Sequence, residues 1–367
     1  MKNEEIQKLF YFPFCNKEEI DRIFNIQNGA DYLLKLRADQ IADNTRLLRV
    51  IRSRVILNEK NWSLERYFTT DHFDYFLNSV SPEHQDSLRS VTYGNIFSSD
   101  PHGRIFPSDY GPIITISDSY YYFFYFMNLA IMNLGKQVPQ HVRINALRIG
   151  IRIMMNKEAM DFDLDPRGII PMEIHKKIAS GIPYKMLFIA GHEFSHYLLG
   201  HLDTNNVSIK PLIFNVNRNI NDGNNLTHKV YNKSQKQELE TDLAAINLPE
   251  LPKDTKKIIM ESALIWCCYI DIFEGAMDII APRNPYRYET HPSPHSRFEN
   301  ILNNAFHGDP NEIDKYRSYH KSLQRWKDFL AEDISIGIEN YEIYGSVYLD
   351  KPNTKWRGKQ LIDRKDY

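Results

Sequence analysis

One apolar run, Tyr184 to His201, constrains the chain more than any other segment, because it contains the hexapeptide GHEFSH at 191–196. The pattern H-E-x-x-H puts His192 and His196 four residues apart, so on a helix they share a face and can bind one metal ion. Glu193 would then lie beside the ion, where it can accept a proton from a bound water. The apolar flanks predict a buried helix. Burying the two histidines and Glu193 there costs free energy of folding unless a bound metal ion compensates for their lost hydration.

The remaining composition is that of a soluble globular protein. Among 367 residues, 42% are apolar and 25% charged, and the net charge is −2. Nucleic-acid and membrane-surface binding are not expected, because both need concentrated Lys and Arg. The apolar stretches 119–134 and 258–280 are too short or too interrupted by acids to span a bilayer, and we predict buried helices. Three cysteines and an N-terminus without a signal peptide predict a cytoplasmic location.

The order of the remaining segments predicts an α+β fold that is mostly helical and contains a small sheet. The β-branched run 111–117 is the clearest strand, and Ser117 or Ser119 could cap the aromatic helix that follows. Residues 60–110 look mixed and turn-rich, whereas the polar segment 202–234 looks like a long loop with a short strand at 212–216. Further helices are expected at 1–60, 143–160, 235–248, 255–280, 296–305 and on to about residue 340.

Two histidines do not complete a catalytic zinc site, which uses three protein ligands and an open position. His201 is one candidate, but the metzincin pattern would need glycine at position 199 and histidine at position 202, which are Leu199 and Leu202. On a continuing helix His201 would also point well away from His196. We therefore expect His201 to be a surface or second-sphere residue.

Glu238 is the better third ligand. It lies four residues before Asp242 on the predicted helix 235–248, so both carboxylates share a face. Glu238 could bind zinc while Asp242 accepts the outer N–H of a ligand histidine. Taken alone, this segment would be interpreted as an amphipathic helix that exposes its acidic side chains to water. The upstream H-E-x-x-H helix favours a metal site over that interpretation. Glu240 faces elsewhere and is expected to be solvent-exposed.

Together, H-E-x-x-H and the downstream E-x-x-x-D resemble the gluzincin metallopeptidases. The segment 290–297, THPSPHSR, is similar to the T-H-P-x-x-x-x-R block of gluzincins that include the prenyl-protein-processing and heat-shock membrane peptidases. This resemblance implies that His291 is a transition-state hydrogen-bond donor. It also implies that Arg297 is a supporting cation near Glu238 or the oxyanion. Without this resemblance, the segment would be interpreted as a proline-rich turn that caps a helix at Ser296. We assign no role in the site to His295, which we expect to belong to this turn.

The Lit-type phage-exclusion peptidases are similar over about residues 110–305, in the order of strand, aromatic helix and metal motifs. The resemblance implies a zincin-like core, with one helix carrying H-E-x-x-H and a second carrying E-x-x-x-D. We accordingly divide the chain into a helical region 1–109, a metallopeptidase core 110–305 and a helical extension with a tail, 306–367. Thr241 stands where the family usually has alanine, and the long loop before Glu238 leaves substrate selection open.

These observations predict a zinc endopeptidase that binds one zinc ion per chain and cleaves a cytoplasmic protein or peptide, with Glu193 as general base. A role in phage defence is implied by the resemblance alone. The alternative is a latent or non-proteolytic zinc-binding regulatory protein that a partner activates. A membrane-associated processing enzyme is disfavoured by the hydropathy. Phe188, Phe194 and Tyr197 could line substrate pockets or belong to the core.

Overall fold

The computed structural model describes residues 3–98, 103–158, 160–164, 170–202, 207–211, 227–231, 234–281, 292–305 and 310–342. The predicted strand at 212–216 and the tail beyond residue 342 lie outside these described residues. As predicted, the fold is mostly helical and contains a small three-stranded sheet. Within the described residues, no helix combines the length and apolar character needed to cross a membrane.

The N-terminal part is a group of helices with its own apolar core. Their bounds are α1 Asn3–Leu9, α2 Lys17–Phe24, α3 Gly29–Asp43, α4 Thr45–Leu57 and the short α5 Leu64–Tyr67. Three of these helices begin at asparagines, because the side chains of Asn16, Asn28 and Asn44 each accept a backbone N–H of the first turn. Phe14, Ile41 and Phe97 are among the residues buried between the helices.

The three-stranded sheet has the order β1-β3-β2, with β1 at Thr92–Ile96, β2 at Arg104–Ser108 and β3 at Gly111–Ser117. The strand predicted at 111–117 is confirmed as β3, which pairs parallel to β1 and antiparallel to β2. A separate antiparallel pair, β4 Val207–Pro211 and β5 Thr227–Tyr231, lies in the segment predicted as a loop. The boundary predicted between residues 109 and 110 lies in the turn that joins β2 to β3, and the division of the chain into three regions stays a prediction.

Residues 60–110 contain more regular structure than predicted. Two helices, α6 Asp71–Ser79 and α7 Pro82–Leu88, precede the sheet. The Ser81–Pro82 pair starts a helix instead of making a turn, because the Ser81 hydroxyl accepts the His84 N–H and proline fits the first helical position. The cap of the aromatic helix also differs: its N-cap residue is Asp118, although the Ser117 hydroxyl accepts the Ser119 N–H.

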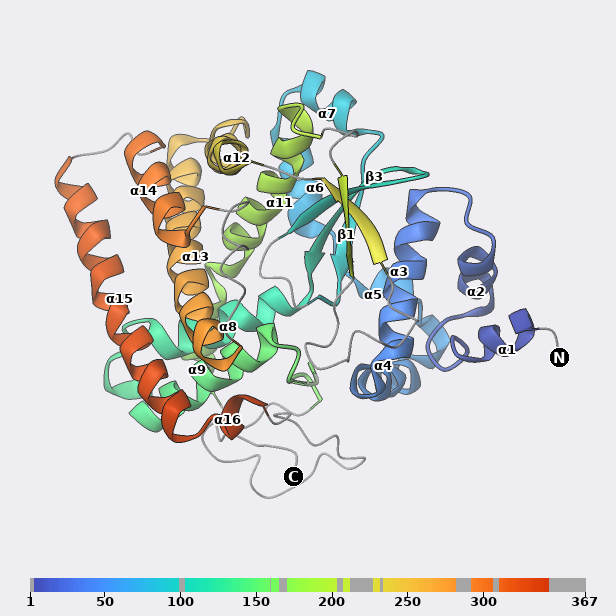
Figure 1. Cartoon of the computed structure of the whole chain (residues 1–367), viewed down its shortest axis with the longest axis horizontal. Helices are drawn as coiled ribbons and strands as arrows, with labels where there is room; N and C mark the ends of the chain where they lie inside the picture. Colours follow the sequence, from blue (N-terminus) through green and yellow to red (C-terminus); the bar gives the residue numbers. More distant parts are fainter. Residues whose placement is uncertain are drawn as a thin grey trace.

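The H-E-x-x-H helix, α11 Ile182–Leu198, lies between the sheet and the C-terminal helices (Figure 1). It packs against α6, α8 and the sheet on one side and against α12 and α13 on the other. The other helices are α8 Ser119–Ile131, α9 Gln140–Met154, α10 Met172–Ala179, α12 Gln235–Asn247, α13 Lys253–Ile280, α14 Pro294–Asn304, α15 Pro310–Ile336 and α16 Glu339–Glu342. The central position of α11 explains its apolar sequence, since every residue from Lys185 to His196 is buried.

Candidate metal centre

Small residues bring α11 close to its neighbours. A Cβ added at Gly191 would lie 2.6 Å from the Phe76 ring of α6 and 3.3 Å from the Ala245 Cβ of α12. The Phe76 contact leaves no room for a side chain at position 191, because real Cβ atoms do not approach another atom so closely, and the Ala245 contact is tight. Glycine and alanine therefore allow α12 to lie against α11 with its Glu238 side chain facing the two histidines.

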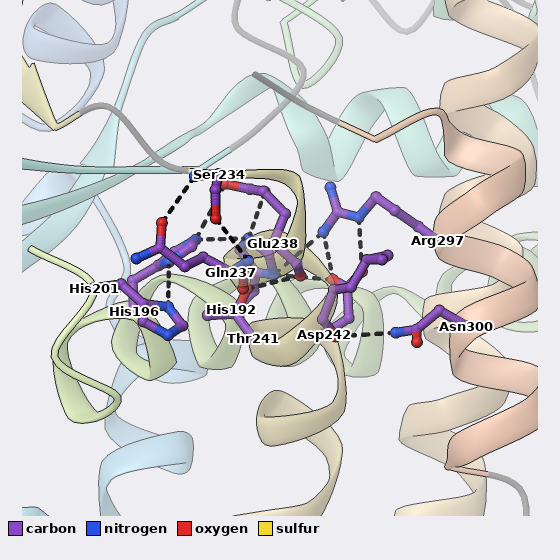
Figure 2. A network of polar contacts seen from close by, with 11 residues as sticks. His192, His196, His201, Ser234, Gln237, Glu238, Thr241, Asp242, Arg297 and Asn300 are labelled. Atoms are coloured by element: carbon purple, nitrogen blue, oxygen red, sulfur yellow. Dashed lines mark hydrogen bonds and ion pairs between the residues drawn. The ribbon is translucent and has the colours of Figure 1, made fainter. Parts of the chain in front are cut away.

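Three buried side chains converge between these two helices (Figure 2). The Nε2 atoms of His192 and His196 lie 3.2 Å apart. Glu238 places one carboxylate oxygen 3.3 Å from His192 Nε2 and the other 3.3 Å from His196 Nε2. The structure thus brings together the three residues that the sequence nominated as ligands.

The spacing of these donor atoms fits a small metal ion. Bonds of about 2.0–2.1 Å in tetrahedral geometry separate neighbouring donor atoms by about 3.3 Å. Calcium would need longer bonds and six to eight oxygen ligands, which two imidazoles do not supply. The His192, His196 and Glu238 side chains could therefore hold a metal ion of the transition-metal type, with one coordination position left for water or substrate.

A buried ion pair supports His192 from behind. Asp242 Oδ1 lies 3.0 Å from His192 Nδ1, and Arg297 donates to both Asp242 oxygens, from Nε at 2.8 Å and from Nη2 at 2.5 Å. The guanidinium also lies 4.4 Å from the Trp266 ring. Because Asp242 accepts from His192 Nδ1, the Nε2 lone pair of this histidine is directed to the metal side. Arg297 thus forms its ion pair with Asp242, and its charge also interacts with the Glu238 carboxylate, near which the resemblance places it.

The electrostatics keep this pair charged. Burial alone would raise the pKa of Asp242, but the Arg297 cation outweighs burial and lowers it. Burial lowers the pKa of Arg297, and the Asp242 carboxylate raises it further than burial lowers it. Burial and Arg297 both lower the pKa of His192, yet the Asp242 and Glu238 carboxylates outweigh them and raise it. Asp242 is therefore an ionised acceptor held in place by Arg297.

His201 does not lie where a continuing helix would put it. The helix ends at Leu198, and Gly200 takes a left-handed conformation with φ of +68°. The His201 N–H donates to the His196 carbonyl and the Gly200 N–H to the Tyr197 carbonyl, which together form a Schellman motif. The turn folds His201 back, so that it is buried with Nδ1 3.3 Å from His196 Nδ1. Gly200 was the sequence signal for this turn.

Glu193 is buried beside Gly103, which immediately precedes β2. A Cβ at Gly103 would lie 2.6 Å from Glu193 Cγ and 3.0 Å from its Oε1. Gly103 therefore leaves space for the carboxylate of the proposed base. Sequence reasoning missed this residue, because a glycine in the run DPHG looks like any turn glycine.

We expect Gly103→Ala to displace the Glu193 side chain and to lower any activity that depends on it by about 100-fold, as misplacements of about 1 Å can do. Metal content should not change, because Glu193 is not one of the three grouped ligands. Gly150→Ala in α9 is the control, since its added Cβ would meet only Met127 at 3.3 Å or more. Parallel assays of metal content and cleavage test the prediction. Full activity in Gly103→Ala would contradict it.

Of the three aromatic residues considered for substrate pockets, two lie in the core and one lies nearer the surface. Phe194 stacks on Phe76 with ring centroids 5.4 Å apart, and Phe188 lies 5.6 Å from Trp266. Both phenylalanines are fully buried, which favours core packing over a substrate pocket. Tyr197 is half-buried and its hydroxyl lies 3.2 Å from Ser90 Oγ.

The T-H-P block is described only in part. His291, the implied hydrogen-bond donor, lies outside the described residues. The helix after the block begins at Pro294, and Ser293 is its cap, accepting the Ser296 N–H at 3.1 Å. His295 is exposed and stacks on His320, with centroids 5.3 Å apart. The cap thus lies three residues before the predicted one.

Comparisons with protein families, curated proteins and solved structures found no match. The likeness to gluzincins consequently depends on the motifs and on the geometry of the metal site.

Proposed function

We propose that this chain is a zinc-dependent endopeptidase of the gluzincin type, with a zincin-like core built around α11 and α12. The observation that carries the proposal is the buried triad of His192, His196 and Glu238, whose donor atoms lie 3.2–3.3 Å apart. Glu193 directly follows the first ligand histidine, His192. A general base at this position supports a catalytic site, because a structural metal site has no use for a base beside the metal.

Each side chain has a distinct role in the proposed reaction. Zinc, when bound, would lower the pKa of a coordinated water to about 7. Glu193 accepts the proton of the attacking water and passes it to the leaving amine. Asp242 orients His192, and Arg297 holds Asp242 in place. His291 is assigned to the developing oxyanion by the resemblance alone.

Purified protein is expected to contain about one zinc ion per chain, removable by a strong chelator, because a three-ligand site binds one ion. Glu238→Ala should lose most of this metal, whereas Glu250→Ala, at an exposed glutamate just after α12, should keep it. Elemental mass spectrometry of the purified proteins measures the ratio. Equal zinc content in the two variants would contradict the assignment of Glu238.

The peptidase activity is best tested in cells, since the substrate is a cytoplasmic protein or peptide that the site does not identify. The wild type and Glu193→Gln are expressed to equal levels, and the proteomes are compared for new protein termini. New termini that occur only with the wild type support the proposal. Identical sets of termini would count against it.

One observation favours a second candidate, a latent zinc protein that a partner activates. His192, Glu193, His196 and Glu238 are each at most 5% exposed, which fits a site that opens only when a partner binds. A latent enzyme would bind zinc when purified but cleave no unfolded test protein. Cleavage would then begin when an extract containing the trigger is added.

A further inference from the structure

The two ligand histidines are supported in different ways. The outer nitrogen of His192 contacts Asp242 of the buried Asp242–Arg297 ion pair, whereas the outer nitrogen of His196 faces another imidazole. His201 Nδ1 lies 3.3 Å from His196 Nδ1, and His201 Nε2 lies 3.4 Å from a carboxylate oxygen of Glu240. Glu240 is on α12, two residues after the ligand Glu238. Helix α12 thus supplies both the ligand Glu238 and the carboxylate of Glu240 that contacts His201.

A metal ion bound by His196 Nε2 would fix how protons are arranged along these contacts. The ion would take the Nε2 lone pair, so the proton of a neutral His196 would be on Nδ1. This N–H needs an acceptor, which His201 Nδ1 provides only if the His201 proton is on Nε2. The Glu240 carboxylate accepts from Nε2 and therefore selects that tautomer. Lys236 also contacts Glu240, at 3.5 Å, on the exposed side.

We propose that Glu240 and His201 form a positioning relay that sets the tautomer and ring orientation of the metal ligand His196. The turn at Gly200 is part of this relay, because it brings His201 back over the end of α11. His201 itself is not among the three grouped ligands, since its nitrogens face the outer nitrogen of His196 and the Glu240 carboxylate. The proposal depends on the metal site proposed above, but not on peptidase activity.

The test uses a pair of variants with the same shape. His201→Asn keeps a polar acceptor near the Nδ1 position, whereas His201→Leu has a similar size and no acceptor. The zinc dissociation constant, measured by competition with a chromophoric chelator, should rise about 10–100-fold in His201→Leu. His201→Asn should recover most of this loss. Lys236→Ala should bind zinc like the wild type. Glu240→Ala should bind it more weakly, and Glu240→Gln, whose amide can still accept from His201 Nε2, should lie between the two.

Spectroscopy separates positioning from simple destabilisation. The absorption spectrum of the cobalt-substituted protein should shift in His201→Leu, because the orientation of His196 changes. In the zinc-bound wild type, nitrogen NMR should show the His201 proton on Nε2. An unchanged zinc affinity and cobalt spectrum in His201→Leu, or a His201 proton on Nδ1, would overturn the relay. A wild type that binds no zinc would overturn the metal site itself, so the two failures are distinguishable.

Discussion

Replacing Glu193 by glutamine is expected to leave zinc bound and to lower peptide cleavage by about 10²–10⁴-fold, the usual contribution of a general base. The amide has nearly the same shape but cannot accept a proton from water at neutral pH. Glu193 is buried next to Gly103 and is not among the three grouped ligands, so the substitution should disturb neither packing nor metal affinity. Cleavage rates and zinc content of purified wild type and variant measure the two effects.

Two comparisons sharpen this experiment. Glu193→Asp keeps the carboxylate but shortens its reach, and it should retain more activity than Glu193→Gln. Glu250→Gln, at an exposed position, should behave like the wild type. A Glu193→Gln protein that binds zinc and cleaves at the wild-type rate would exclude Glu193 as the base. A variant that loses zinc would instead show that Glu193 supports the metal.

Replacing Arg297 by methionine is expected to lower the free energy of unfolding by about 3–5 kcal/mol, because Asp242 would remain as a buried charge without its cation. The two side chains are 3% exposed or less, and the pair has two hydrogen bonds. Loss of the Trp266 contact adds to the effect. Urea unfolding of the metal-free proteins measures the difference without a contribution from zinc binding.

An exposed ion pair between α15 and α14 provides the matched control. Arg317 of α15 contacts Glu299 of α14 at 2.7 Å, but both side chains are partly in water, so Arg317→Met should cost far less stability than Arg297→Met. The double variant Arg297→Met/Asp242→Leu should recover much of the lost stability, because no buried charge is left unpaired. It should still bind zinc more weakly than the wild type, since His192 has lost its acceptor. Equal losses for Arg297→Met and Arg317→Met would contradict the prediction.

Patterns within one helix could be predicted from the sequence. The spacing of His192 and His196 follows from the helical repeat, and the helix over Glu238 and Asp242 was equally readable, because four residues always return a side chain to the same face. The strand 111–117 was predictable from its β-branched residues and flanking turns. In each case the determining contacts are local along the chain.

The places where prediction and structure differ depend on turns or on contacts between distant segments. His201 was expected on the surface or in the second sphere of the metal, and its buried place beside His196 depends on the left-handed Gly200, which ends the helix and reverses the chain. Gly103 could not be recognised, because the Glu193 carboxylate that requires it lies 90 residues away in the sequence.

The sequence by itself determined the composition of the candidate metal site: two histidines on one helical face, a glutamate beside them, and a glutamate and an aspartate on a second face. Only the tertiary structure decided how these parts are joined. It paired Arg297 with Asp242, and it placed His201 and Glu240 behind His196. The physical reason is that helical periodicity fixes which side chains share a face. The packing of α11, α12 and α14, which depends on small residues such as Gly191 and Ala245, fixes which faces meet.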